Sequence, residues 1–84
     1  MRTPNLSTDL TDLVRHLARG LVRHPEALEV RVLDGDPMLY EIHVAQEDQG
    51  RIIGREGRTI RALRMVVGAA ARKAGGSATV EVAE

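Results

Sequence analysis

Two glycines three residues apart, Gly54 and Gly57, constrain the fold of this chain more than any other feature of its sequence. They lie in the segment GRIIGREGRTI, residues 50–60, where isoleucines and arginines flank them on both sides. Glycine permits backbone conformations and close approaches that a Cβ would block. The pattern therefore predicts a tight turn between two helices, with backbone that can come close to an anion.

The charge of the chain is zero overall but is unevenly distributed. The full sequence has twelve basic and twelve acidic residues, whereas residues 51–73 hold seven basic residues and one acidic residue, Glu56. This segment carries a net charge of +6 and the rest of the chain −6. Such asymmetry predicts a local positive face on a neutral protein, although most charge runs are only solvated helix faces.

The length and composition indicate one small domain. We expect residues 7–84 to form it, preceded by a flexible N-terminus at residues 1–6. The chain has no cysteine, which excludes a disulfide framework, a thiolate nucleophile and a cysteine-based zinc site. No apolar run approaches the roughly 18–20 residues that a membrane span needs, and the N-terminus lacks the apolar segment of a signal peptide. We therefore expect a cytoplasmic protein with no membrane partner.

The hydrophobic pattern predicts six elements in the order α-β-β-α-α-β. Apolar residues recur at helical spacing from Leu10 to Val22, after a capping Ser7 or Thr8, and His24-Pro25 ends this first helix. The elements expected after it are strands at 28–33 and 38–45, helices at about 46–53 and 58–74, and a strand at 78–82. The short turn between the first two strands predicts an antiparallel hairpin. The two-helix crossover is long enough to return the third strand parallel to the second.

The glycine turn and its neighbours predict a site for single-stranded nucleic acid. Free N–H groups where Gly57 enters the second helix, and the dipole of that helix, attract an anion. Phosphates would lie on the turn, and bases would lie in an apolar groove beside it. The residues expected to contribute are Ile53, Gly54, Arg55, Glu56, Gly57, Arg58, Ile60 and Arg61. A corner between two helices, with glycine serving geometry alone, remains open at this point because a bare G-x-x-G is common.

The same segment resembles the I-G-x-x-G-x-x-I signature of KH domains, whose G-x-x-G loop clamps the backbone of about four nucleotides. The order α-β-β-α-α-β is that of a type II KH domain. From about Leu10 to Val82, segments such as LVRHPEALEVRVL and YEIHVAQEDQGRIIGREGRTIRALRMVVGAAARKAG resemble the KhpA family of bacterial single-KH-domain proteins. The resemblance implies an α+β, type II KH fold with a three-stranded mixed sheet covered by helices on one face.

The resemblance also implies a function. Residues 54–57 would meet the RNA backbone, Ile53 and Ile60 would flank it, and Val44 is a weaker candidate for the groove wall. KhpA-like proteins are similar to RNA chaperones or post-transcriptional regulators, linked to cell shape and cell-wall synthesis. The partners implied are single-stranded RNA, a second copy of the chain and a KhpB-like KH-containing protein.

One residue of the turn opposes its predicted ligand. The carboxylate of Glu56 is negative and would repel a phosphate, unless the side chain points to solvent or pairs with Arg58 or Arg51. Tyr40 is the one aromatic residue of the chain, which excludes platforms on which bases stack. We expect bases to be held by aliphatic packing, hydrogen bonds and stacking on arginine.

Catalytic and metal-binding patterns are absent from the sequence. The histidines His16, His24 and His43 are scattered, with no H-E-x-x-H pair. We therefore expect no enzyme activity, no metal and no cofactor. The alternatives to an RNA-binding module are a KH-fold module for protein interaction or dimerisation, with little RNA binding of its own, and a KH piece of an enzyme. The segment GRIIGREGR also resembles a KH segment of a bacterial ribonuclease, but no hydrolase motif accompanies it.

Overall fold

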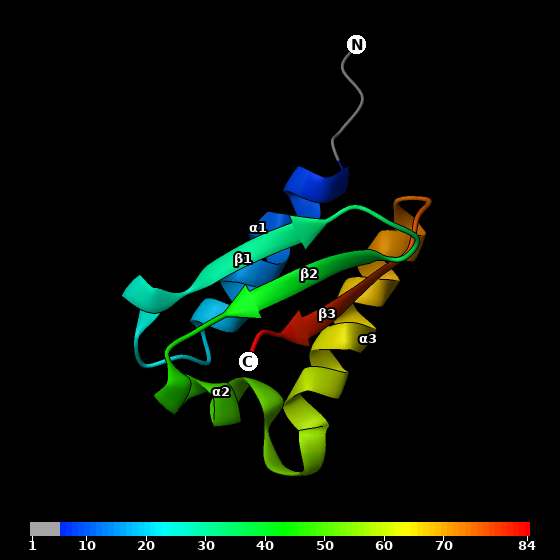
Figure 1. Ribbon diagram of the computed structural model, residues 1–84. Coiled ribbons are helices and arrows are strands. Elements are labelled where there is room, and N and C mark those ends of the chain that lie inside the picture. Colours follow the sequence, from blue (N-terminus) through cyan, green and yellow to red (C-terminus); the bar gives the residue numbers. More distant parts are fainter. Residues whose placement is uncertain (1–5) are drawn as a thin grey trace.

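Two long helices cover one face of a three-stranded sheet, and a short helix lies at one end of it (Figure 1). This computed structural model describes residues 6–84, with side chains from Leu10 onward. The elements are α1 (Leu6–Arg19), β1 (Glu29–Leu33), β2 (Met38–His43), α2 (Gln46–Ile53), α3 (Arg58–Lys73) and β3 (Ala78–Val82), with single 3-10 turns at Pro25–Ala27 and Arg55–Gly57. The predicted order α-β-β-α-α-β is confirmed. The predicted flexible terminus falls outside the described residues except for Leu6, and the capping side chains of Ser7 and Thr8 also fall outside them.

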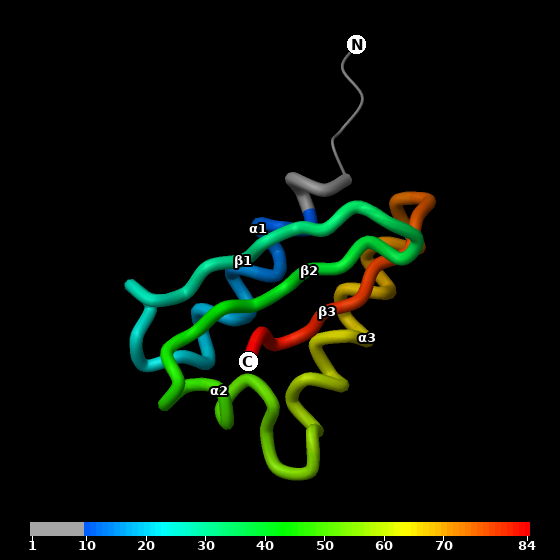
Figure 2. Tube along the Cα trace, viewed as in Figure 1, coloured from blue at the N-terminus to red at the C-terminus, as the bar shows by residue number. Residues whose placement is uncertain are grey.

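The sheet is mixed, with β2 in its centre. β1 pairs with β2 antiparallel, so that Val30 lies opposite Ile42, and β3 pairs with β2 parallel, so that Val80 lies opposite Tyr40. The path through α2 and α3 returns the chain to the start of β3 beside β2 (Figure 2). The predicted hairpin and parallel crossover are both confirmed.

The core lies between the sheet and the helices. Its buried apolar residues are Leu10, Val14, Ala18, Val30, Tyr40, Ile42, Ile52, Ile60, Leu63, Val67, Ala71 and Val80. Because successive side chains of a strand point to opposite faces, the residues between them, such as Glu29, Arg31, Glu41 and His43, lie on the open face of the sheet. Tyr40 is completely buried, so the one aromatic ring of the chain cannot stack on a base.

The first helix ends earlier than its apolar spacing predicts. α1 stops at Arg19 rather than at His24, and the N–H of Gly20 still bonds to the carbonyl of His16 at 3.3 Å before the chain turns away. Residues 21–22 nevertheless pack against the core while only partly buried. Glycine is a poor helix former, and the apolar spacing continues because the loop covers the same core.

The second strand is also shorter than predicted. β2 ends at His43, because the extended Ala45 (φ −57°, ψ 146°) caps α2 and its carbonyl accepts the N–H of Asp48 at 2.8 Å. Val44 is therefore a linker residue, partly buried against the core.

A buried carboxylate fastens the loop after α1 to the first turn of α2. Asp48 is 1% exposed. Its oxygens accept the backbone N–H of His24 at 2.9 Å and that of Arg23 at 3.1 and 3.2 Å, and Arg51 Nε lies 3.6 Å from it. Burial raises the pKa of this carboxyl, but the hydrogen bonds and the nearby His24 and Arg51 outweigh burial, so the pKa lies below the ordinary value of 3.8. α2 is held in place by this contact.

Within residues 6–84, no helix is long and apolar enough to cross a membrane.

Candidate nucleic-acid interface

The turn between α2 and α3 is built on a backbone conformation that only glycine adopts readily. Gly54 has φ 77° and ψ 169°, a region that is essentially closed to residues with a Cβ. A Cβ at this position would also lie 2.8 Å from the backbone nitrogen of Thr59 and 2.7 Å from its Cβ. Gly54 is therefore required both for its dihedral angles and for the close approach of Thr59.

The second glycine is required for a different reason. Gly57 has φ 73° and ψ 16°, in the left-handed region, but a Cβ there would meet only Ile60 Cγ2, at 3.9 Å. Its neighbour Glu56 is also left-handed, with φ 57° and ψ 25°, and has the only positive φ among the non-glycine residues described. The turn thus places two successive left-handed residues at its tip, one of which carries a side chain.

Two of the N–H groups at the start of α3 are used inside the turn. The N–H of Gly57 bonds to the carbonyl of Gly54 at 3.1 Å, and the N–H of Arg58 bonds to the carbonyl of Arg55. Of the free N–H groups predicted where Gly57 enters the helix, those of Gly57 and Arg58 are therefore not free, because the turn closes on itself. The N–H groups of Arg55 and Glu56 have no acceptor within residues 6–84, so the donors lie at the tip of the turn.

The three arginines of the turn have different environments. Arg55 is exposed, with no carboxylate within ion-pair distance in the described part of the chain. Arg58 Nη2 lies 3.8 Å from Glu56 Oε2, in a solvent-exposed pair of the kind that contributes little stability. Arg61 Nη2 donates to the carbonyl oxygen of Glu56 at 3.0 Å, so this guanidinium holds the turn as well as supplying charge.

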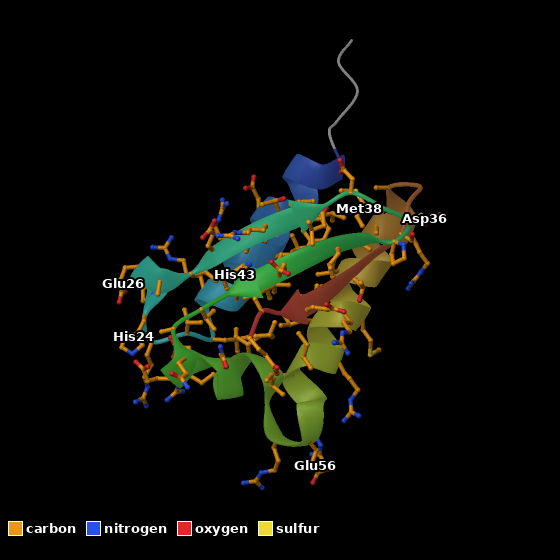
Figure 3. The ribbon with its side chains drawn as sticks, viewed as in Figure 1. His24, Glu26, Asp36, Met38, His43 and Glu56 are labelled. Carbon is orange, nitrogen blue, oxygen red and sulfur yellow. The ribbon has the colours of Figure 1, made fainter. Side chains whose placement is uncertain are left out.

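Glu56 projects from the tip of the turn, away from the rest of the domain (Figure 3). Of the two pairings expected for it, the one with Arg58 is present, whereas Arg51 approaches Asp48 instead, at 3.6 Å. Its carboxylate therefore partly neutralises a neighbouring arginine but does not enter the apolar groove.

A groove of about 270 Å³ lies beside the turn, lined by residues of α2, α3 and the edge strand β3. It is lined by Ile53, Ile60, Arg64, Glu81, Val82 and Glu84. The two predicted isoleucines therefore face one cavity, which places apolar surface next to the arginines of the turn. Val44 does not line this cavity, because it packs against the core.

Four of the lining residues escaped the sequence analysis. Arg64 follows Ile60 by four positions on α3, and helical spacing puts both on one face, so this residue was detectable. The three residues on or after β3 were not, because only the pairing of β3 with β2 brings that end of the chain to the turn.

The basic segment of residues 51–73 does not form one surface. Arg72 and Lys73 lie in the last turn of α3, whose 16 residues span about 24 Å at 1.5 Å per residue. They are therefore at the opposite end of α3 from the turn. The positive charge beside the groove comes from the arginines between residues 51 and 64.

A larger cavity, of about 510 Å³, lies at the other end of the domain. It is lined by Gly35, Asp36, Met38, Gly75, Gly76 and Ser77, and Asp36 and Met38 lie far from Glu56 in Figure 3. The hydroxyl of Ser77 already donates to Asp36 at 2.5 Å. The lining of this cavity has no basic side chain, so it does not suit a polyanion. Among the side chains of residues 10–84, no group of three metal-ligating residues is placed to hold an ion.

Replacing Glu56 with glycine is expected to stabilise the domain by up to about 1 kcal/mol. A left-handed residue with a Cβ costs about 1–2 kcal/mol, of which the greater chain entropy of glycine cancels part. Urea denaturation measures the change. Glu56→Gln serves as the control, because it removes the charge and keeps the Cβ; a gain of equal size in both variants would assign the effect to charge instead of backbone.

The α-β-β-α-α-β order, the mixed sheet and the glycine turn between α2 and α3 together define a KH domain. Residues 11–82 match the family model described as "KhpA/KhpB, KH domain". The chain belongs to the KhpA/KhpB KH-domain family.

Several relatives are named "RNA-binding protein KhpA". The chain is 40% identical to the one from Caldanaerobacter subterraneus subsp. tengcongensis, over 84% of this chain and 96% of that protein. It is 48% identical to the one from Halalkalibacterium halodurans, over 73% of this chain and 82% of that protein. It is 41% identical to the one from Mycobacterium leprae, over 74% of this chain and 79% of that protein. No solved structure matches the chain.

Proposed function

We propose that this chain binds single-stranded RNA, with its phosphates on the G-x-x-G turn and its bases in the adjacent groove. The observation that carries the proposal is that unpaired donors and apolar surface meet at one place. The exposed guanidinium of Arg55 and the N–H groups at the tip of the turn lie next to a cavity whose walls include Ile53 and Ile60. The names of the relatives, "RNA-binding protein KhpA", support the same class of ligand.

The proposed binding is weak and tolerant of sequence at the turn. Contacts to phosphate carry no sequence information, and non-specific binding of this kind has dissociation constants on the order of micromolar or weaker. Of the expected site residues, Gly54 and Gly57 shape the turn, and Glu56 contributes its backbone N–H. Arg58 and Arg61 supply positive charge around the turn, and both also contact Glu56.

Arg55→Asp is expected to weaken RNA binding about tenfold, because it reverses the charge of the turn arginine that makes neither an ion pair nor a hydrogen bond within the described residues. Fluorescence anisotropy with a short unstructured RNA measures the loss. The melting temperature should change little, since the exposed side chain of Arg55 packs against nothing in the core.

Arg15→Asp is the matched control, because it makes the same change of net charge on an exposed arginine of α1. Equal losses in both variants would show that binding depends on net charge alone and would count against the turn as the site. About three phosphate contacts also predict a log–log salt slope near −2, which should become shallower in Arg55→Asp.

We further infer, from the family resemblance alone, that residues 7–84 form a single KH domain and that the protein acts in the cytoplasm. Its inferred role is that of an RNA chaperone or post-transcriptional regulator linked to cell shape and cell-wall synthesis. Crosslinking and sequencing of bound RNA in cells, wild type against Arg55→Asp, tests this. Loss of crosslinks in the variant supports a role for the turn in cells, whereas unchanged crosslinks would favour protein interaction as the main function.

A second candidate function, protein interaction, is favoured by an apolar strip on the outer side of α3. The strip consists of Ala62, Met65, Val66 and Ala69, all exposed and spaced at i, i+3, i+4 and i+7. Met65 is 74% exposed and Val66 47%. Exposed apolar residues that gather on one side of a helix suit a partner, here a second copy of the chain or a KhpB-like protein.

Val66→Asp is expected to shift the protein toward monomer in light scattering across a concentration series, with RNA affinity unchanged. Leu33→Asp is the control, because Leu33 is equally exposed, at 48%, but lies on β1. The same oligomeric state in wild type and Val66→Asp, at every concentration, would remove this candidate for self-association.

A further inference from the structure

The two edges of the sheet differ in how their backbone groups are covered. At the edge strand β3, the carbonyl oxygen of Val80 accepts Arg64 Nε at 2.9 Å. α3 also lies close to this strand, since a Cβ on Gly68 would be 3.7 Å from the carbonyl oxygen of Ala78. Unpaired backbone groups at a sheet edge are a template for another strand, and these contacts restrict that template at β3. β1 forms the other edge, on the far side of β2 from β3 (Figure 1).

β1 carries one acid and one base on the same face. Glu29 and Arg31 lie on the open face of the sheet, with side chains that are each 59% exposed, whereas Val30 and Val32 face the core. Arg31 Nε donates to Glu29 Oε1 at 3.1 Å, and this hydrogen bond lowers the pKa of the Glu29 carboxyl. Both side chains are therefore charged at neutral pH.

These charges select one way for β1 to pair with the β1 strand of a second copy. In an antiparallel pair, residues directly opposite each other point to the same face, and like charges there are destabilising. A two-fold axis at Val30 places Glu29 opposite Arg31 of the second copy, and Arg31 opposite Glu29. An axis at residue 29 or 31 places two carboxylates or two guanidiniums opposite each other. Of the five residues of β1, only Val30 gives pairs of opposite charge.

The same axis also matches the core face of the strand. It places Val32 opposite Leu28 of the second copy, and both are partly buried apolar residues that pack against the core. On the open face, opposite Cβ atoms would be about 4.5–5.5 Å apart, whereas residues i and i+2 of one strand are about 6.6 Å apart. Each charge would therefore lie nearer to its counterpart in the second copy than to the one on its own strand.

We propose that β1 is an interaction surface at which two copies of this chain pair antiparallel about Val30, joining their sheets into one. The contact is closed, because each copy uses its β1 edge and keeps β3 at the outer border. At about 4.8 Å between neighbouring strands, the two β3 strands lie about 24 Å apart, so the pairing covers neither glycine turn. This surface is separate from the strip on α3, and the inference does not depend on RNA binding.

The test exchanges charges in a Val66→Asp parent, in which the strip on α3 does not contribute. Sedimentation equilibrium is expected to show dimers of this parent at about 0.1–1 mM, because a contact between two five-residue strands is small and weak. Glu29→Arg or Arg31→Glu, added singly, should weaken association about tenfold, since two pairs of opposite charge become pairs of like charge. An equimolar mixture of these two variants should associate as the parent does, because the charges of one copy then complement those of the other.

Glu81→Arg is the matched control, since it makes the same change of charge at an exposed position of β3 and should leave the association of the parent unchanged. A parent that is monomeric at every concentration would overturn the proposal and leave the proposed function standing. A mixture that associates no better than either variant alone would overturn it too. Equal weakening by Glu81→Arg would assign the effect to net charge and would likewise count against β1 as the surface.

Discussion

Gly54→Ala is expected to destabilise the domain by about 3 kcal/mol or more and to abolish RNA binding by the turn. A strained backbone costs about 1–3 kcal/mol, and a Cβ 2.8 Å from the backbone nitrogen of Thr59 adds an overpacking cost of similar size. Domains of this length have stabilities on the order of 5–10 kcal/mol, so the loss is a large fraction of the total. Urea denaturation measures it.

Gly57→Ala is the matched control for Gly54→Ala. Its Cβ has room, so only the left-handed conformation is penalised, at about 1–2 kcal/mol. We expect Gly57→Ala to stay folded and to bind RNA more weakly than wild type. Equal destabilisation by the two substitutions would contradict the close approach of Thr59 as the reason for Gly54.

Asp48→Ala is expected to lower the melting temperature by on the order of 10 °C. The substitution leaves the N–H groups of Arg23 and His24 without their acceptor, and an unsatisfied buried donor costs more than the hydrogen bond itself contributes. Differential scanning calorimetry measures the change. Because this carboxylate fastens α2, which leads into the turn, RNA affinity should fall as well.

The neighbouring Glu47→Ala is the control, since Glu47 is exposed and its carboxylate pairs, among the described residues, with the ring of His24 alone, at 3.6 Å. A drop as large as that for Asp48→Ala would show that the effect arises from charge at the start of α2. It would count against the buried hydrogen bonds as its cause.

The same carboxylate makes stability depend on pH in acid. The pKa of Asp48 is lowered from 3.8 in the folded protein, so its contribution is present in full well above pH 3.8 and is lost as the pH falls through the folded pKa. We expect Asp48→Asn to lose less stability than wild type between pH 5 and pH 2. Parallel pH profiles of the two proteins would contradict this assignment.

Hydrophobic alternation and the lengths of the connections predicted most of the fold, because they determine how neighbouring elements pair. The alternation along β1 and β2, with the short turn between them, was sufficient for the hairpin, and the length of the crossover was sufficient for the parallel β3. The end of α1 was missed because the apolar spacing continued through residues 21–22, which cover the core without being helical.

The candidate site was predicted unevenly. Its isoleucines, glycines and arginines lie within one stretch of residues 53–61, and the structure gathers them around one turn and one groove. The N–H groups of Gly57 and Arg58 are bonded inside the turn, which could not be predicted because hydrogen bonding inside a turn depends on three-dimensional closure. Glu81, Val82 and Glu84, which also line the groove, were not predicted as site residues because they are distant in sequence from the turn.

By itself, the sequence determined that this chain forms an α-β-β-α-α-β domain with a glycine turn between two helices, because periodicity and glycine spacing act over a few residues. Only the tertiary structure decided that Gly54 is closed to any Cβ by Thr59, whereas Gly57 is not. It also decided that the basic segment divides between the two ends of α3, and that β3 brings Glu81 and Glu84 to the groove. These features depend on contacts between elements, and side-chain spacing along the chain contains no measure of such distances.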